Sequence, residues 1–312
     1  MWLLTSAFLM LRGTLLYLSE SKRARQLLLR LPGARNLPQL FIAGETLADA
    51  LAAVIRLKDA GFQFTLDHLG ESVTDAEAAR AACGDYIKIL DRLAHEGLRP
   101  NISIKLTALG MALDEQLARR NLAAIAERAR KHGGFVRIDM EGSSYVESTL
   151  RTFRETDAPR DSLGVVIQAY LRRSERDIDD LVAMGARVRL VKGAYQEPAQ
   201  IAFPDKKDVD ENFVKLAAKL LASGGYHAIA THDPGMIAAT RDFARRQKIG
   251  PERYEFQMLY GVSRHLQRQL IAQGYRMRIY VPFGSQWYPY FMRRLAERPA
   301  NVLFLLRNLI RG

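Results

Sequence analysis

The sequence is poor in cysteine and lacks the short motifs of several common enzyme classes. Its 312 residues include a single cysteine, Cys83, which rules out an intrachain disulfide and a cysteine-ligated zinc site. It contains no HExxH motif and no carboxylate run with metal-ligand spacing, so we expect no metal centre. A GxSxG nucleophile motif is absent, as is a glycine-rich phosphate turn after the first predicted strand. These absences argue against a metalloenzyme, a serine hydrolase of that type and a dinucleotide-binding open sheet.

Long hydrophobic runs are missing as well. The most apolar segment, residues 1–18, is interrupted by Arg12, and its apolar stretch is shorter than the ~18 residues of a membrane-spanning helix. Lys22, Arg23 and Arg25 follow it, whereas a secretory signal would carry its positive charge before the apolar run. Two interpretations stay open: a helix that packs on the domain, or an interfacial helix that rests on an anionic membrane.

Positive charge is in excess over negative charge. Lysine and arginine number 46 against 34 aspartates and glutamates, which gives a net charge of +12. An excess of this size favours an anionic neighbour, such as lipid headgroups, nucleic acid or an acidic ligand. Because no recognition-helix or RNA-binding signature accompanies the charge, we expect no nucleic-acid partner.

A regular alternation of predicted strands and helices begins after residue 60. Eight short runs rich in valine, isoleucine, phenylalanine or tyrosine are separated by stretches of helical character. The runs cover residues 63–67, 101–106, 135–139, 165–170, 187–192, 227–231, 254–259 and 277–282. This pattern predicts an α/β fold, a (β/α)₈ TIM-type barrel over residues 61–312, preceded by a helical N-terminal arm over residues 1–60. An open doubly wound sheet is the alternative, but it would need the missing glycine-rich turn.

Capping residues locate several of the helices. Residues 43–61 predict a helix capped by Thr46. Residues 114–131 predict a second helix, capped by Asp114 and stopped at Gly133–Gly134, and a third is predicted over 208–222.

Polar residues stand at or near the end of almost every predicted strand. They are Asp67, His68, Lys105, Asp139, Gln168, Arg189, Lys192, Thr231, His232, Asp233, Gln257 and Tyr280. Since the carboxyl ends of barrel strands carry the active site, we expect these side chains to converge around a ligand with many polar atoms. A lysine in a barrel strand can also form a Schiff base, so a Schiff-base or phosphate-binding lyase that uses Lys105 or Lys192 is the alternative.

Residues 286–298 predict a helix with an unusual stripe. Tyr290, Arg293, Arg294 and Glu297 recur at the i, i+3, i+4, i+7 spacing that is normally apolar. Two adjacent arginines can hold one carboxylate or phosphate through forked hydrogen bonds. Glu297 would orient Arg293 as an i, i+4 pair. We expect this helix to lie over the barrel mouth.

Eight segments carry a resemblance to a known family. They are SIKL at 103–106, RIDME at 137–141, IQAY at 167–170, RLVKGAYQEP at 189–198, ATHD at 230–233, YEFQMLYGV at 254–262, IYVPFG at 279–284 and YFMRRLAE at 290–297. In this order they resemble proline dehydrogenase, the flavin-dependent enzyme of proline catabolism. The resemblance implies a (β/α)₈ barrel with its last helix above the barrel, noncovalent FAD, L-proline as substrate, 1-pyrroline-5-carboxylate as product and a membrane quinone as electron acceptor. The length of the chain leads us to expect the monofunctional bacterial type.

The same resemblance implies roles for individual residues. Asp139 and Arg189 would be the catalytic residues, with Asp139 holding the polar network under substrate and flavin and Arg189 beside flavin N5. The substrate would be bound by Lys105, Arg293 and Arg294 at its carboxylate, with Glu297 beside them, and by Leu190, Tyr195, Leu259, Tyr280 and Tyr290 around its ring. FAD would contact Met140, Gln168, Arg189, Val191, Lys192, Gly193, Thr231 and His232.

Four further polar or aromatic residues have less definite roles. Asp67 and His68 match no family role and are expected to be structural, whereas Tyr170 and Gln257 would serve either the FAD shell or the core. A quinone dissolves in the bilayer, so the implied location is the cytoplasm, with peripheral association at the inner face of the cell membrane.

Overall fold

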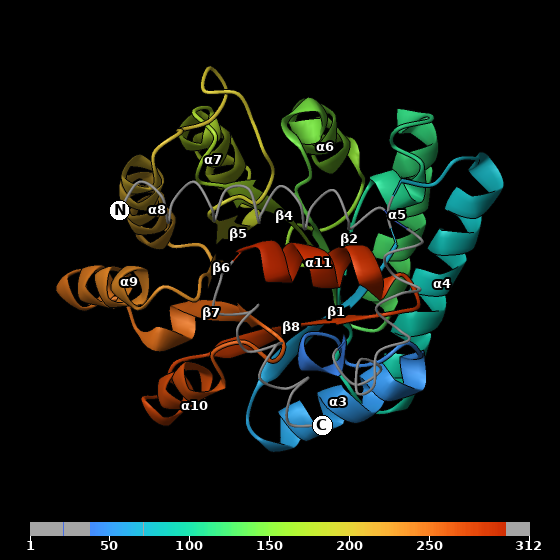
Figure 1. Cartoon of the computed structure of the whole chain (residues 1–312), viewed down its shortest axis with the longest axis horizontal. Coiled ribbons are helices and arrows are strands. Elements are labelled where there is room, and N and C mark those ends of the chain that lie inside the picture. The colour runs from blue at the N-terminus through green and yellow to red at the C-terminus, as the bar shows by residue number, and fades with distance from the viewer. Residues whose placement is uncertain (1–20, 22–37, 71, 298–312) are drawn as a thin grey trace.

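Eight parallel strands close into a barrel and follow one another around it in chain order (Figure 1). The structure, a computed structural model, describes residue 21 and residues 38–70 and 72–297. The strands are β1 (Gln63–His68), β2 (Asn101–Ile104), β3 (Phe135–Ile138), β4 (Leu163–Gln168), β5 (Arg187–Val191), β6 (His227–Ala230), β7 (Tyr254–Leu259) and β8 (Met277–Phe283). Each overlaps one predicted run, and β8 pairs with β1 to complete the ring. The (β/α)₈ fold predicted from the sequence is confirmed.

Helices precede, connect and follow the strands, and all but the last of them cover the outside of the barrel (Figure 1). They are α3 (Leu47–Asp59), α4 (Ala76–His95), α5 (Glu115–Lys131), α6 (Val146–Glu155), α7 (Ser174–Ala183), α8 (Lys206–Ala222), α9 (Pro234–Arg246), α10 (Arg264–Ala272) and α11 (Trp287–Glu297). Thr46 caps α3 by accepting a hydrogen bond from the Asp49 amide, and Asp114 caps α5 by accepting one from the Gln116 amide. Both predicted caps are therefore confirmed.

The strands alternate between two environments because successive side chains point to opposite faces of a strand. On β5, Val188 and Leu190 are fully buried in the apolar layer between the strands and the helices. Arg189 and Val191 lie on the other face, where they line a cavity inside the barrel mouth. This alternation separates the apolar core from the polar barrel interior.

α11 lies across the barrel at its carboxyl-terminal mouth, in front of the strands in Figure 1. It packs on a segment from the other end of the described chain, which starts with the short 3₁₀ turn η2 (Pro38–Leu40). The rings of Phe41 and Phe291 are 6.0 Å apart between centroids, and Trp287 donates a hydrogen bond of 2.7 Å to Glu45. This small apolar cluster, distinct from the barrel core, holds α11 over the mouth.

The predicted N-terminal arm is described only in part. Its helix α3 packs against β1 and β8, whereas residues 1–18 lie outside the described residues, so the division at residue 60 stays a prediction. Among the residues that the structure describes, no helix is both long enough and apolar enough to cross a bilayer.

Candidate active site

A cavity of about 410 Å³ opens at the carboxyl ends of the strands, beneath α11. All eight strands or the residues directly after them contribute to its wall. The predicted residues in this wall are Lys105, Asp139, Met140, Gln168, Arg189, Val191, Lys192, Gly193, Tyr195, Thr231, His232, Leu259, Tyr280, Tyr290, Arg293 and Arg294. The topology therefore brings most of the predicted site together at one place.

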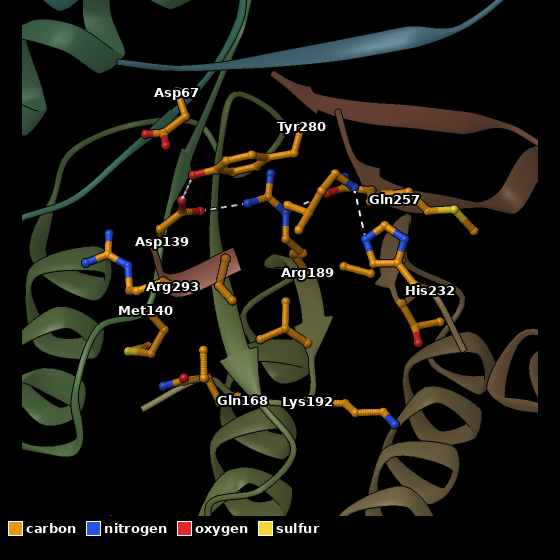
Figure 2. Close-up of a pocket in the computed structure, with 18 of the residues that line it drawn as sticks. Asp67, Asp139, Met140, Gln168, Arg189, Lys192, His232, Gln257, Tyr280 and Arg293 are labelled. Carbon is orange, nitrogen blue, oxygen red and sulfur yellow. Dashed lines mark hydrogen bonds and ion pairs between the residues drawn. The ribbon is translucent and has the colours of Figure 1, made fainter. Parts of the chain in front are cut away.

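Arg189 lies at the centre of the cavity wall and its guanidinium is held on three sides (Figure 2). Its Nη1 donates to Asp139 Oδ1 at 2.6 Å, its Nε to Gln257 Oε1 at 2.5 Å, and its Nη2 to Ser103 Oγ at 3.0 Å. The hydroxyl of Tyr280 donates to the other oxygen of Asp139 at 2.7 Å. With only 4% of its surface exposed, Arg189 is a positive charge fixed in position and direction.

Burial shapes the titration of this network. Desolvation raises the pKa of Asp139, against the opposing pull of Arg189 and Lys105. Burial and the charge of Asp139 also raise the pKa of the Tyr280 phenol well above its ordinary value. Tyr280 therefore stays protonated and donates its hydrogen bond throughout the physiological pH range.

The two lysines of the site are each paired with carboxylates. Lys105 Nζ is 3.2 Å from Asp67 Oδ1, and the side chain of Asp67 is fully buried. Lys192 Nζ lies 2.8 Å from Asp210 Oδ1 and 3.2 Å from Asp233 Oδ2. Lysines that form Schiff bases are typically desolvated in apolar pockets or placed beside other cations. These ion pairs therefore argue against the lyase alternative.

Gly193 lets the chain turn over the cavity directly after β5. Its φ is +114°, and a Cβ at this position would come within 2.2 Å of the Tyr170 ring. The Tyr170 amide donates to the Lys192 carbonyl at 2.8 Å, which fixes the chain against that ring. Only glycine fits this close approach, and it carries the next two residues, Ala194 and Tyr195, into the cavity wall.

His232 follows β6 and is fixed by the backbone of β7. The Leu259 amide donates to His232 Nε2 at 3.2 Å, which holds the ring against β7. Its neighbour Thr231 accepts a hydrogen bond from the Asp233 amide at 3.1 Å, and Asp233 in turn caps α9. The turn between β6 and α9 is thereby ordered at the edge of the cavity.

α11 places the predicted arginines over the opening. Tyr290, Arg293 and Arg294 all line the cavity, and the guanidinium carbon of Arg294 lies 5.1 Å from the centroid of the Tyr290 ring. Figure 2 shows Arg293 on the Asp139 side of the cavity. The side chain of Glu297, the fourth residue of the predicted stripe, lies outside the described residues.

Leu190 does not line the cavity, contrary to one expectation from the resemblance. It was expected to wall the substrate ring, but its side chain is fully buried in the outer apolar core. The reason is the alternation of β5, because Arg189 and Val191 occupy the inner face and Leu190 must then point outward.

The cavity wall includes two residues to which the sequence assigned no definite binding role. Asp67 lines the cavity through its pair with Lys105, and Gln257 lines it through its bond to Arg189. The period of two offers a signal for Gln257, which lies two residues before Leu259 on β7. His68 lies outside the wall, where its ring stacks on Phe283 with centroids 5.1 Å apart.

A cavity lies at the carboxyl mouth of the (β/α)₈ barrel, with a fixed guanidinium inside and arginines on the covering helix. This arrangement is typical of a TIM-barrel enzyme with an anionic ligand. Comparisons with known proteins agree with this class. The family model described as Proline dehydrogenase matches residues 50–307. Proline dehydrogenase 2 of Bacillus subtilis (strain 168) is 42% identical over 277 residues, which cover 89% of this chain and 91% of the relative. Proline dehydrogenase 1 of the same strain is 41% identical over 302 residues, 97% of this chain and 100% of the relative.

Solved structures give the same answer. A crystal structure of proline utilization A (PutA) from Bdellovibrio bacteriovorus, inactivated by N-propargylglycine, matches with a TM-score of 0.79 and 29% sequence identity. The match covers 85% of this chain but 33% of that one, so this chain spans about a third of that protein. The chain belongs to the proline dehydrogenase family, and it is an oxidoreductase of proline catabolism.

Proposed function

We propose that this protein oxidises L-proline to 1-pyrroline-5-carboxylate with noncovalent FAD and passes the electrons to a membrane quinone. The observation that carries the proposal is the three-sided anchoring of Arg189 inside a cavity that α11 covers with Arg293 and Arg294. A fixed cation suits a site where negative charge develops, and two arginines suit a substrate carboxylate.

The cavity residues fit a flavin. A Cβ at Gly193 would meet the Tyr170 ring, so the turn that borders the cavity needs glycine, and His232 and buried Gln168 line the same cavity. We assign Gln168 and Lys192 to the pyrimidine end, Met140 to the ring system, and Val191, Gly193, Thr231 and His232 to the rest of FAD. When bound, FAD would supply the acceptor for the hydride that leaves proline C5. Arg189 would stabilise the negative charge that this transfer produces.

Substrate binding falls to a second group of residues in the cavity wall. Arg293, Arg294 and Lys105 would hold the proline carboxylate, since charge-assisted hydrogen bonds are strong in a site shielded from water. Four residues of the wall would enclose the ring: Tyr195, Leu259, Tyr280 and Tyr290. The contribution of Glu297 rests on the family resemblance alone.

Asp139 acts in this proposal as a holding group. One of its oxygens accepts from Arg189 and the other accepts from Tyr280. A carboxylate engaged on both oxygens fixes its two partners and keeps their groups pointed at the cavity. Positioning and charge stabilisation then carry the reaction, without a covalent intermediate on the protein.

The visible spectrum of the purified protein tests the proposal. We expect flavin absorbance that bleaches when L-proline is added without oxygen and returns when a quinone analogue is added. A colourless protein, or a flavin that proline does not reduce, would overturn the proposal. Trapping of a carbonyl substrate on Lys105 or Lys192 by borohydride would support the lyase instead.

Electron transfer to a quinone requires contact with the bilayer, and the net charge of +12 favours anionic lipid. We propose peripheral binding at the cytoplasmic face of the membrane, helped by the apolar residues 1–18. Co-sedimentation with anionic vesicles should be strong at low salt and weaker at high salt, because the attraction is screened within ~8 Å at physiological ionic strength. Protein that stays in the supernatant with anionic vesicles at low salt would remove the membrane part of the proposal.

A further inference from the structure

The barrel interior beneath Arg189 is polar rather than apolar. Gln257 and Glu255 are two residues apart on β7, so both face the inside of the barrel. They are 3% and 2% exposed. Buried polar groups of this kind are costly unless each one is satisfied, so their hydrogen bonds need to be accounted for.

The bonds form a chain with a fixed direction. Arg189 Nε donates to Gln257 Oε1 at 2.5 Å, and Gln257 Nε2 donates to Glu255 Oε1 at 2.5 Å. A guanidinium can only donate and a carboxylate can only accept. The amide of Gln257 therefore has a single orientation that satisfies both neighbours, with its oxygen toward Arg189 and its nitrogen toward Glu255.

Glu255 is itself held by three further hydrogen bonds, from Arg278 and Tyr226. Arg278 Nε and Nη2 donate to its two oxygens at 2.7 and 2.9 Å, and the hydroxyl of Tyr226 donates to Oε2 at 2.9 Å. Burial alone would raise the pKa of Glu255, but the charge and hydrogen bonds of Arg278, with those of Gln257 and Tyr226, lower it to about 2. The carboxylate at the base of the chain is thus an anion throughout the working pH range.

We propose that Glu255 is a positioning residue that acts through Gln257 to fix the guanidinium of Arg189 in the direction required at the flavin. The inference rests on the proposed function, in which Arg189 faces flavin N5. Without a carboxylate acceptor beneath it, the Gln257 amide loses the partner that defines its orientation. The Nε–H of Arg189 then no longer has an acceptor in a fixed position, and the buried guanidinium is held only by Asp139 and Ser103.

Another residue that contacts Glu255 offers a matched control for this proposal. Tyr226 bonds to Glu255 on Oε2, whereas Gln257 bonds to Oε1. Tyr226→Phe removes one buried hydrogen bond to Glu255 and leaves the link to Arg189 in place. A purely structural role for Glu255 would make its variants resemble Tyr226→Phe.

The experiment measures flavin midpoint potential and anaerobic flavin reduction by proline in the holoenzyme. Glu255→Gln removes the charge, and Glu255→Asp keeps the charge for Arg278 while shortening its reach toward Gln257. Because a less ordered cation stabilises reduced flavin less well, we expect both variants to lower the potential and to slow reduction roughly tenfold, the scale of losing an outer positioning partner. Tyr226→Phe should lower the melting temperature and leave both quantities unchanged. Should Glu255→Gln fail to fold, Glu255→Asp carries the test.

A double-mutant cycle distinguishes action through Gln257 from a direct effect of charge. In a Gln257→Met background, the Glu255 variants should cause no additional shift in potential. Additive shifts in that background, or unchanged potentials in the Glu255 variants, would overturn the inference. Arg189→Met separates this outcome from the proposed function: if it leaves the potential and the reduction rate unchanged, the assignment of Arg189 to the flavin is itself wrong.

Discussion

Arginine side chains occupy two different environments in the cavity. Arg189 is nearly fully buried and anchored by Asp139, Gln257 and Ser103, which suits a charge that must not move. Arg293 and Arg294 are half-buried on α11, in the part of the cavity wall where we propose that the substrate carboxylate binds. Substitutions should therefore separate the two: changes to Arg189 affect flavin reduction, and changes to the α11 arginines affect substrate affinity.

Arg294→Met tests the substrate side. Loss of one partner in a desolvated charge contact costs about 2–3 kcal/mol, so the KM for proline should rise about 30- to 150-fold. Flavin content should stay at the wild-type level. Arg246→Met, at an exposed position at the end of α9, is the control and should leave KM unchanged. A wild-type KM in Arg294→Met would remove this arginine from the carboxylate site.

His227 on β6 makes folding stability depend on pH. Its Nδ1 accepts from the Val188 amide at 3.2 Å, and burial, with the nearby arginines, lowers its pKa from 6.5 to about 4. Between these values the unfolded chain binds a proton that the folded chain does not. Stability should therefore fall as the pH drops from 6.5 to 4, by up to about 3 kcal/mol from this residue.

Denaturant unfolding at pH 7 and pH 5 measures this contribution. His227→Gln should make stability less dependent on pH, whereas the exposed His265→Gln should leave the dependence unchanged. An equal pH dependence in wild type and His227→Gln would show that this ring does not titrate as its burial predicts.

At the scale of elements, the turn after β5 shapes the part of the cavity that we propose to hold the flavin. Gly193→Ala would bring a Cβ to within 2.2 Å of the Tyr170 ring at a φ of +114°. We expect purified Gly193→Ala to contain less than a tenth of the wild-type flavin. Gly185→Ala is the matched control, because Gly185 also has a positive φ of +68° but no atom within 4 Å of the added Cβ. It should cost about 1 kcal/mol of stability and keep its flavin.

The anchoring of α11 depends on residues from the opposite end of the described chain. Phe41→Ala removes a ring that packs on Phe291, and such truncations cost about 3–5 kcal/mol. We expect a higher KM for proline, because Arg293 and Arg294 lose their fixed position over the cavity. Phe153→Ala, in a fully buried site on α6, should lower the melting temperature by a similar amount and leave KM unchanged. Equal KM values in the two variants would show that α11 does not need this anchor.

Over the whole molecule, the sequence predicts the strands and helices better than it predicts the contacts between side chains in the site. The eight strands are found where runs of β-branched and aromatic residues occur, and the caps at Thr46 and Asp114 follow from local chemistry. The period of two would also have placed Leu190 outside once Arg189 is inside. The contact of Lys192 with Asp210 could not be predicted, because it depends on how α8 packs beside β5.

The pairing of β1 with β8 joins segments that are very far apart in the chain, since Arg278 donates to Gln63 across 215 positions. Contacts of such long range are formed late, because the entropy of closing the loop must be overcome before they contribute. Asp67 and Tyr280 stand on either side of this seam, so the cavity is incomplete until it closes. A cofactor would therefore meet an already folded barrel, and it would stabilise the native state by mass action instead of guiding the chain toward it.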